Sequence, residues 1–177
     1  SPQELADLVL ADLTAAMDRD YPEDAAPEAL QAQNLDHDVY MEDRARFFVG
    51  QAKRLDQLDA HALPPEATLG PEPPLVLTSL AGDGKSAILA AWCLRFRQRH
   101  PEVLLIPHFA RAAADSGDVE GLAARILGVL KTECGISRPL PELRRQRLAA
   151  LPGWLDMAAR KRPIALVLDG LDQLTGP

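Results

Sequence analysis

The chain has 177 residues, 47% hydrophobic and 25% charged, so it is long enough to bury a core and too apolar for global disorder. With 19 basic and 26 acidic residues its formal charge is −7, which argues against nucleic acid and against an anionic membrane surface as partners. Its two cysteines, Cys93 and Cys134, argue against a disulfide scaffold and fit a reducing cytoplasmic location.

The N-terminal part of the sequence predicts helices. Apolar residues recur at helical spacing over 4–18 and 27–46, and residues 1–46 are expected to form a helical lead-in. A third helix is expected after Gly50. The five prolines within 61–74 make a helix or a central strand unfavourable, so this stretch is expected to be an exposed connector.

From residue 75 onward, strand and helix patterns alternate. Strands are expected over 75–78, 103–106 and 164–168, and helices over 84–99, 118–133 and 141–160. The strand patterns carry no polar alternation, which is typical of buried parallel strands. This order predicts an α/β fold with a mainly parallel sheet over residues 47–177. We expect the chain to be a piece of a longer protein.

A glycine-containing loop joins the first expected strand to the helix after it. Gly84, Lys85 and Ser86 match the end of the G-x-x-x-x-G-K-[ST] pattern, in which backbone N–H groups surround a phosphate. Lys85 is expected near the β- and γ-phosphates, and Ser86 on Mg²⁺. The alternative is an ordinary strand-to-helix turn. The expected nucleotide-binding residues of this loop are Ser79, Leu80, Ala81, Gly82, Asp83, Gly84, Lys85, Ser86 and Ala87.

A second acidic signal follows the last expected strand. The run 164–168 ends in Asp169, at the edge where ligands bind in open parallel sheets. Asp169 is expected to bind the Mg²⁺ held by Ser86, directly or through water, and Asp172 to polarise the attacking water or to help hold the metal. The alternative is an Asp-Gly turn after a core strand.

At this point the residues resemble a family. Residues 166–174 resemble the hhhhDGxDE Walker B motif of NACHT-type P-loop ATPases, and 48–51 resemble the hhGR element that precedes their phosphate loop. The stretch from Pro107 onward is similar to the nephrocystin-3-like branch. The resemblance implies a three-layer sandwich, incomplete at its C-terminal side, that binds ATP or ADP with Mg²⁺. It places Val49 and Gly50 near the adenine.

The family's usual role implies a signal-transduction switch with nucleotide-dependent self-association and further domains in the same chain, such as C-terminal repeats. We therefore expect an ATP-binding and ATP-hydrolysing domain of slow turnover, with Lys85 and Asp172 as catalytic residues. Three departures, Ser79, Gln51 and Gln173, motivate the alternative of a nucleotide-independent scaffold or interaction module. A small-molecule kinase is a third, weaker hypothesis.

Residues outside the two motifs carry a weaker signal. His108 is expected to be a hydrogen-bonded structural histidine rather than a general base. The basic clusters at 144–147 and 160–162 are expected to be solvated, given the net charge of −7. Both cysteines are expected to be small buried apolar side chains.

Overall fold

A computed structural model describes residues 29–63, 73–80, 82–113 and 116–175, together with Val9 and Asp12. The chain divides into one unit that ends at Ala32 and a second that begins at Gln33. In the first unit, the predicted helix over 4–18 lies outside the described residues, except that Val9 and Asp12 are helical. The arrangement below concerns the second unit.

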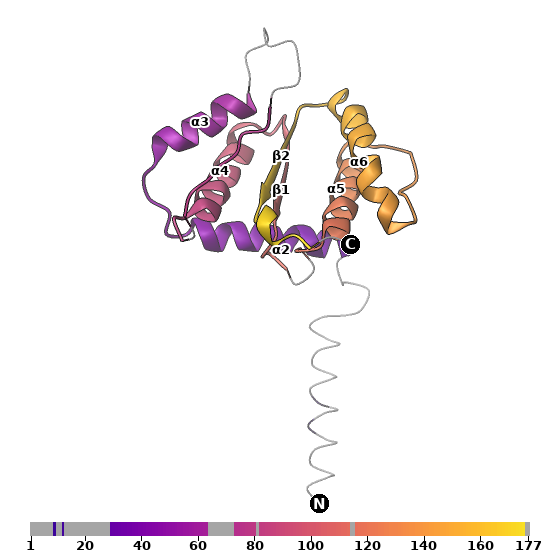
Figure 1. Cartoon of the computed structure of the whole chain (residues 1–177), viewed down its shortest axis with the longest axis horizontal. Helices are drawn as coiled ribbons and strands as arrows, with labels where there is room; N and C mark the ends of the chain where they lie inside the picture. The colour runs from indigo at the N-terminus through magenta and orange to yellow at the C-terminus, as the bar shows by residue number, and fades with distance from the viewer. Residues whose placement is uncertain are drawn as a thin grey trace, which may run out of the picture. The chain divides into compact units, whose positions relative to one another are not determined.

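The elements follow the predicted order closely (Figure 1). They are α2 (Ala29–Ala45), α3 (Ala52–Ala62), α4 (Lys85–Arg99), β1 (Leu104–Phe109), α5 (Val119–Glu133), α6 (Arg144–Ala159), β2 (Ile164–Asp169) and the 3₁₀ turn η2 (Leu171–Gln173). The helices predicted from residue 27 onward are confirmed, each with bounds shifted by a few residues. α3 ends inside the expected proline-rich connector, of which 64–72 lie outside the described residues.

The two strands form a parallel pair at the centre of the second unit. Their register runs from Leu104 opposite Ile164 to Phe109 opposite Asp169. Because parallel strands need a crossover connection, α5 and α6 both lie between them in the sequence. Figure 1 shows α3 and α4 on one side of the pair and α5 and α6 on the other. Every residue of β1 is buried as a result.

The core is made from helix faces that the sequence spacing anticipates. In α4, Ile88, Trp92 and Phe96 lie four residues apart and are all buried. In α5, an apolar stripe at similar spacing is buried, and Trp154 of α6 is fully buried. Burial of each such side chain contributes about 1.5–3 kcal/mol, which explains why these helices hold β1 on both faces.

The start of α5 has a clear local cause. The Asp118 carboxylate accepts hydrogen bonds from the backbone N–H groups of Glu120 at 3.3 Å and Gly121 at 3.0 Å. These N–H groups have no partner within the helix, so a side-chain acceptor at the N-cap stabilises the first turn. Asp118 therefore sets the residue at which α5 begins, just before the buried apolar stripe of that helix.

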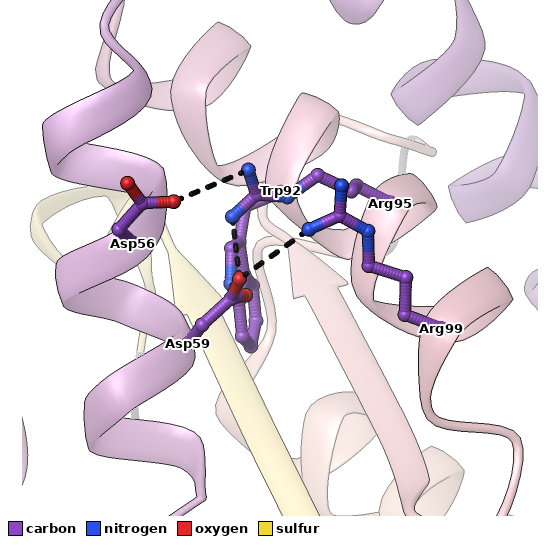
Figure 2. Close-up of polar contacts among 5 residues, drawn as sticks. All are labelled: Asp56, Asp59, Trp92, Arg95 and Arg99. Carbon is purple, nitrogen blue, oxygen red and sulfur yellow. Dashed lines mark hydrogen bonds and ion pairs between the residues drawn. The ribbon is translucent and has the colours of Figure 1, made fainter.

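A polar network joins α3 to α4 (Figure 2). Asp59 accepts a hydrogen bond from Trp92 Nε1 at 2.8 Å and from Arg95 Nη2 at 2.7 Å. Arg99 lies at 3.9 Å from the same carboxylate, and Asp56 at 3.7 Å from Arg95. The paired carboxylate satisfies an indole N–H that burial would otherwise leave without an acceptor.

The predicted three-layer sandwich with a mainly parallel sheet is wrong. Helices predominate, and the sheet within the described residues has two strands only. The segment 75–78, expected to be a buried strand, has no regular structure, and Val76 is 73% exposed. An apolar run becomes a strand only where a ladder partner and a covering layer are available, and this segment has no ladder partner among those residues. In β2, only Val167 is buried.

Candidate functional site

The loop that precedes α4 takes its shape from two glycines. Gly82 has φ of 90° and Gly84 has φ of 81°, in the left-handed region that side chains with a Cβ rarely adopt. A Cβ at either position would meet no atom within 4 Å. The glycines are therefore required by backbone conformation and not by space. Gly84 is also the N-cap of α4 and offers no side-chain acceptor to the first turn.

Side chains of the loop close it onto itself. Lys85 Nζ donates to the carbonyl oxygens of Ser79 at 2.8 Å and Leu80 at 3.0 Å, and lies 3.3 Å from Ser79 Oγ. The Asp83 carboxylate accepts from the backbone N–H of Leu80 at 3.0 Å. Asp83 is exposed, as expected, but it also occupies a donor that a phosphate oxygen would otherwise use. Any anion that enters the loop has to compete with both contacts.

The other residues predicted to bind the nucleotide differ in how far they are exposed. Ser86 and Ala87 lie half-buried in the first turn of α4, and Ala81 lies outside the described residues. Val49 is 87% exposed and Gly50, with φ of 85°, is exposed as well. The predicted adenine contacts at these two residues stay a prediction.

The second motif lies at the carboxyl end of β2. Burial in α4 raises the pKa of the Cys93 thiol to about 12; the charge of Arg97 acts against this rise, and the charge of Asp169 contributes to it. Gly170 has φ of 77°, and a Cβ there would approach the Ala110 side chain to 3.1 Å. The four residues between α4 and β1 reverse the direction of the chain, and β2 runs parallel to β1. The N-terminal end of α4 and the carboxyl ends of both strands therefore lie on the same side of the unit (Figure 1).

Gln173 has a structural role that sequence analysis missed. Its Oε1 accepts a hydrogen bond from Arg111 Nε at 2.6 Å, which links η2 to the chain just beyond β1. Asp172 lies in η2 beside it. The metal roles of Ser86 and Asp169 stay predictions. Within the described residues, no group of three or more His, Cys, Asp or Glu is placed to hold a metal ion.

A buried polar cluster that sequence analysis did not anticipate lies between α2, β1 and α5. His37 is 1% exposed, and its Nδ1 accepts from the backbone N–H of Phe109 at 3.2 Å. His108 Nε2 donates to the carbonyl oxygen of Ser116 at 2.8 Å, as expected of a structural histidine. Arg125 Nη1 donates to the carbonyl oxygen of Pro107 at 2.8 Å.

The buried surroundings shift the pKa values of His37 and Arg125. Burial, followed by the charges of Arg125 and His108, lowers the pKa of His37 to about 3. Burial also lowers the pKa of Arg125 to about 10. The His37 and His108 rings lie with centroids 4.8 Å apart. The only sequence signal was the position of His37 four residues before Met41, on the face of α2 that turns inward.

Comparison with known proteins gives relatives named for tetratricopeptide repeats. Tetratricopeptide repeat protein 41 of Rattus norvegicus is 26% identical over 205 aligned positions, which cover 98% of this chain and 16% of the relative. The protein of the same name in Mus musculus is 29% identical over 107 positions, 58% of this chain and 8% of the relative. A TPR repeat-containing protein of Dictyostelium discoideum is 18% identical, covering 78% of this chain and 10% of the relative.

The chain thus spans at most about a sixth of the length of these relatives. No family model matches the chain, and no solved structure matches it. No helix within the described residues is long and apolar enough to span a membrane.

These findings overturn the family identification made from the sequence. The relatives are tetratricopeptide repeat proteins by name, so the assignment to NACHT-type P-loop ATPases of the nephrocystin-3-like branch is wrong. The residue patterns at 79–86 and 164–169, which the sequence indicated as the Walker A and Walker B motifs of an ATP-binding protein, receive no support from the comparisons. The two-stranded sheet within the described residues agrees with this correction.

Proposed function

We propose that this chain is an interaction module of a larger tetratricopeptide repeat protein and acts as a scaffold without needing nucleotide. The observation that carries the proposal is the set of relatives, all named for such repeats and matched over a small part of their length. Stacked helical repeats form extended surfaces that bind other proteins. A cytoplasmic location stays a prediction.

The surface of the module supports this role. Four large apolar side chains, at Phe47, Val49, Val76 and Leu80, are each more than 70% exposed. Exposed apolar side chains are common singly, but four this exposed within 34 residues of sequence (80 − 47 + 1) favour contact with another protein surface. The proposed partner is the repeat-bearing remainder of the same protein.

The test measures binding of this chain to that remainder by calorimetry, with and without Mg·ATP. Equal affinity under both conditions is expected. The double variant Val49→Asp, Val76→Asp should lose binding, because it places charge on the apolar contact. Leu148→Asp, on the exposed side of α6, serves as the matched control and should bind normally. Undetectable binding of the unaltered chain would refute the proposal.

One observation favours a second candidate function, the binding of a nucleotide phosphate by residues 79–86. Lys85 places its ammonium inside a loop shaped by Gly82 and Gly84, at the start of a helix of 15 residues. The N-terminal end of such a helix favours negative charge. ATP or ADP with Mg²⁺ is the ligand that this arrangement would take, with Ser86 and Asp169 on the metal.

Thermal unfolding with Mg·ATP, Mg·ADP and Mg²⁺ alone tests the second candidate. Ligand at 100 times its Kd would stabilise the chain by about 2.7 kcal/mol. The shift should vanish in Lys85→Ala and persist in Lys53→Ala, which alters a lysine of α3 instead. An unchanged unfolding temperature at millimolar nucleotide excludes this candidate and leaves the scaffold proposal untouched.

A further inference from the structure

A small cavity lies in the buried polar cluster. Its volume open to the centre of a water molecule is about 10 Å³, and it is lined by Gln33, His37, His108, Ser116, Gly121 and Arg125. Such a volume has room for a single species of about the size of water. The lining comes from α2, β1, the turn before α5 and α5 itself, so the cavity is part of the folded unit and not of a surface loop.

Arg125 brings a cation to this cavity that has no matching anion among the described residues. Its side chain is buried, with the residue 5% exposed, and Nε has no hydrogen-bond partner in the described part of the chain. Across residues 29–63, 73–80, 82–113 and 116–175, no carboxylate forms an ion pair with it. Asp38 is the acid whose charge reaches Arg125, but its carboxylate pairs with Arg97 at 2.8 Å. The charges of Arg125, Arg97 and Asp38 together sum to +1.

A buried, unpaired charge is costly, because removal from water is not repaid by a partner. The cost falls if an anion of the right size enters beside the guanidinium. Arginine retains its charge under all ordinary conditions, so the alternative of losing the proton is closed to it. The lack of an ion-pair partner among the residues that the structure describes therefore favours a ligand of negative charge.

Of the remaining lining groups, His37 adds a second donor that suits an anion. Because His37 Nδ1 accepts the Phe109 N–H, the neutral ring carries its proton on Nε2 and is a donor there. His108 already donates its Nε2 proton to the Ser116 carbonyl, so its Nδ1 is an acceptor and the donors left for an anion are those of Arg125 and His37. None of the six lining residues carries a carboxylate.

We propose that this cavity binds one halide ion, chloride under ordinary conditions, with the Arg125 guanidinium as its counter-charge. The positive charge of Arg125 favours a halide ion over a neutral water molecule in this cavity. Size favours a halide over sulfate or phosphate, which exceed a cavity made for one small species. The site would tie α2 to α5 across the end of β1, and so make the stability of the unit depend on chloride.

The test is thermal unfolding at constant ionic strength, with sodium gluconate replaced stepwise by sodium chloride or bromide. A saturable rise in Tm is expected with either halide. Sulfate, in contrast, acts through exclusion from the protein surface and should give a rise that does not saturate. Identical Tm values in chloride and gluconate would overturn the proposal.

Two further measurements locate the effect. Arg125→Met removes the charge at similar length and should abolish the halide dependence, whereas Arg99→Gln, an exposed arginine of α4, should retain it. A halide dependence that survives in Arg125→Met overturns the proposal. Bromide in crystals of the unaltered chain needs no folded variant: an anomalous peak within hydrogen-bond distance of Arg125 Nε supports the site, and a cavity without one refutes it.

Discussion

Acid should destabilise this chain through one buried histidine. His37 is held neutral in the fold, because burial and the neighbouring Arg125 and His108 lower its pKa from 6.5 to about 3. Its Nδ1 is committed as the acceptor of the Phe109 N–H, so a proton added there removes a hydrogen bond to β1. Protonation would also place a second positive charge beside a buried guanidinium.

The magnitude follows from linkage between protonation and folding. The unfolded chain takes up a proton at His37 as the pH falls through 6.5, whereas the folded chain does so only near pH 3. The stabilising effect of the neutral ring is thus fully present above pH 6.5 and is lost progressively below it. At about 1.4 kcal/mol per pH unit, the loss between pH 8 and pH 5 is about 2 kcal/mol.

The assay is urea unfolding, followed by the fluorescence of Trp92 and Trp154, both buried in the fold. The free energy of unfolding is measured at half-unit intervals from pH 8 to pH 5 for the unaltered chain and for His37→Asn. The asparagine keeps an acceptor for the β1 N–H and cannot titrate. Leu35→Ala, on the exposed face of the same helix, is the matched control.

The difference in unfolding free energy between the unaltered chain and His37→Asn should shrink by about 2 kcal/mol over this range, because only the former loses stability through His37. Leu35→Ala should stay parallel to the unaltered chain. If His37→Asn also runs parallel from pH 8 to pH 5, the ring is accessible to protons in the fold and the argument from burial is wrong.

Three further predictions concern stability and are checked by urea unfolding at pH 7.5. Asp59→Ala should lower the free energy of unfolding by about 2–3 kcal/mol, because it leaves a buried indole N–H and a guanidinium without their acceptor. Asp56→Ala removes an exposed contact of 3.7 Å and should lower it by less than about 1 kcal/mol. Equal losses in the two variants would contradict this prediction. Gly84→Ala should destabilise by about 1–2 kcal/mol through its positive φ, whereas Gly153→Ala, in the open middle of α6, should stabilise by up to about 1 kcal/mol. Asp118→Ala should cost about 1 kcal/mol with a normal m-value, and no loss would mean that α5 begins without its cap.

Helix prediction succeeded from residue 27 onward because each of these helices carries its own information. The spacing of Ile88, Trp92 and Phe96 specifies one buried face, and Asp118 marks the start of α5 in the sequence itself. Such signals are local, so they survive whatever the rest of the fold does. The 3₁₀ turn at 171–173 was not predicted, because a turn of this length has no periodicity to detect.

The candidate sites show the opposite behaviour. The loop glycines were found from the sequence, because a left-handed backbone conformation leaves a residue-type signature. The contact of Lys85 with two carbonyl oxygens was not found, since it depends on how the chain folds back between residues 79 and 85. The cluster of His37 and Arg125 brings together residues 88 positions apart (125 − 37), which no single-sequence pattern records.

Two apolar runs of similar composition, 75–78 and 164–168, differ in structure. Residues 164–168 form a strand, because β1 supplies a complete ladder from Leu104 to Phe109. Residues 75–78 have a similar apolar sequence, but they are irregular and mostly exposed, because they have no ladder partner within the described part of the chain. Strand formation is therefore a property of a pair of segments and not of one. An apolar segment that its own unit leaves uncovered is a surface available to another, and Val76, in that segment, is one of the side chains placed on the proposed interface.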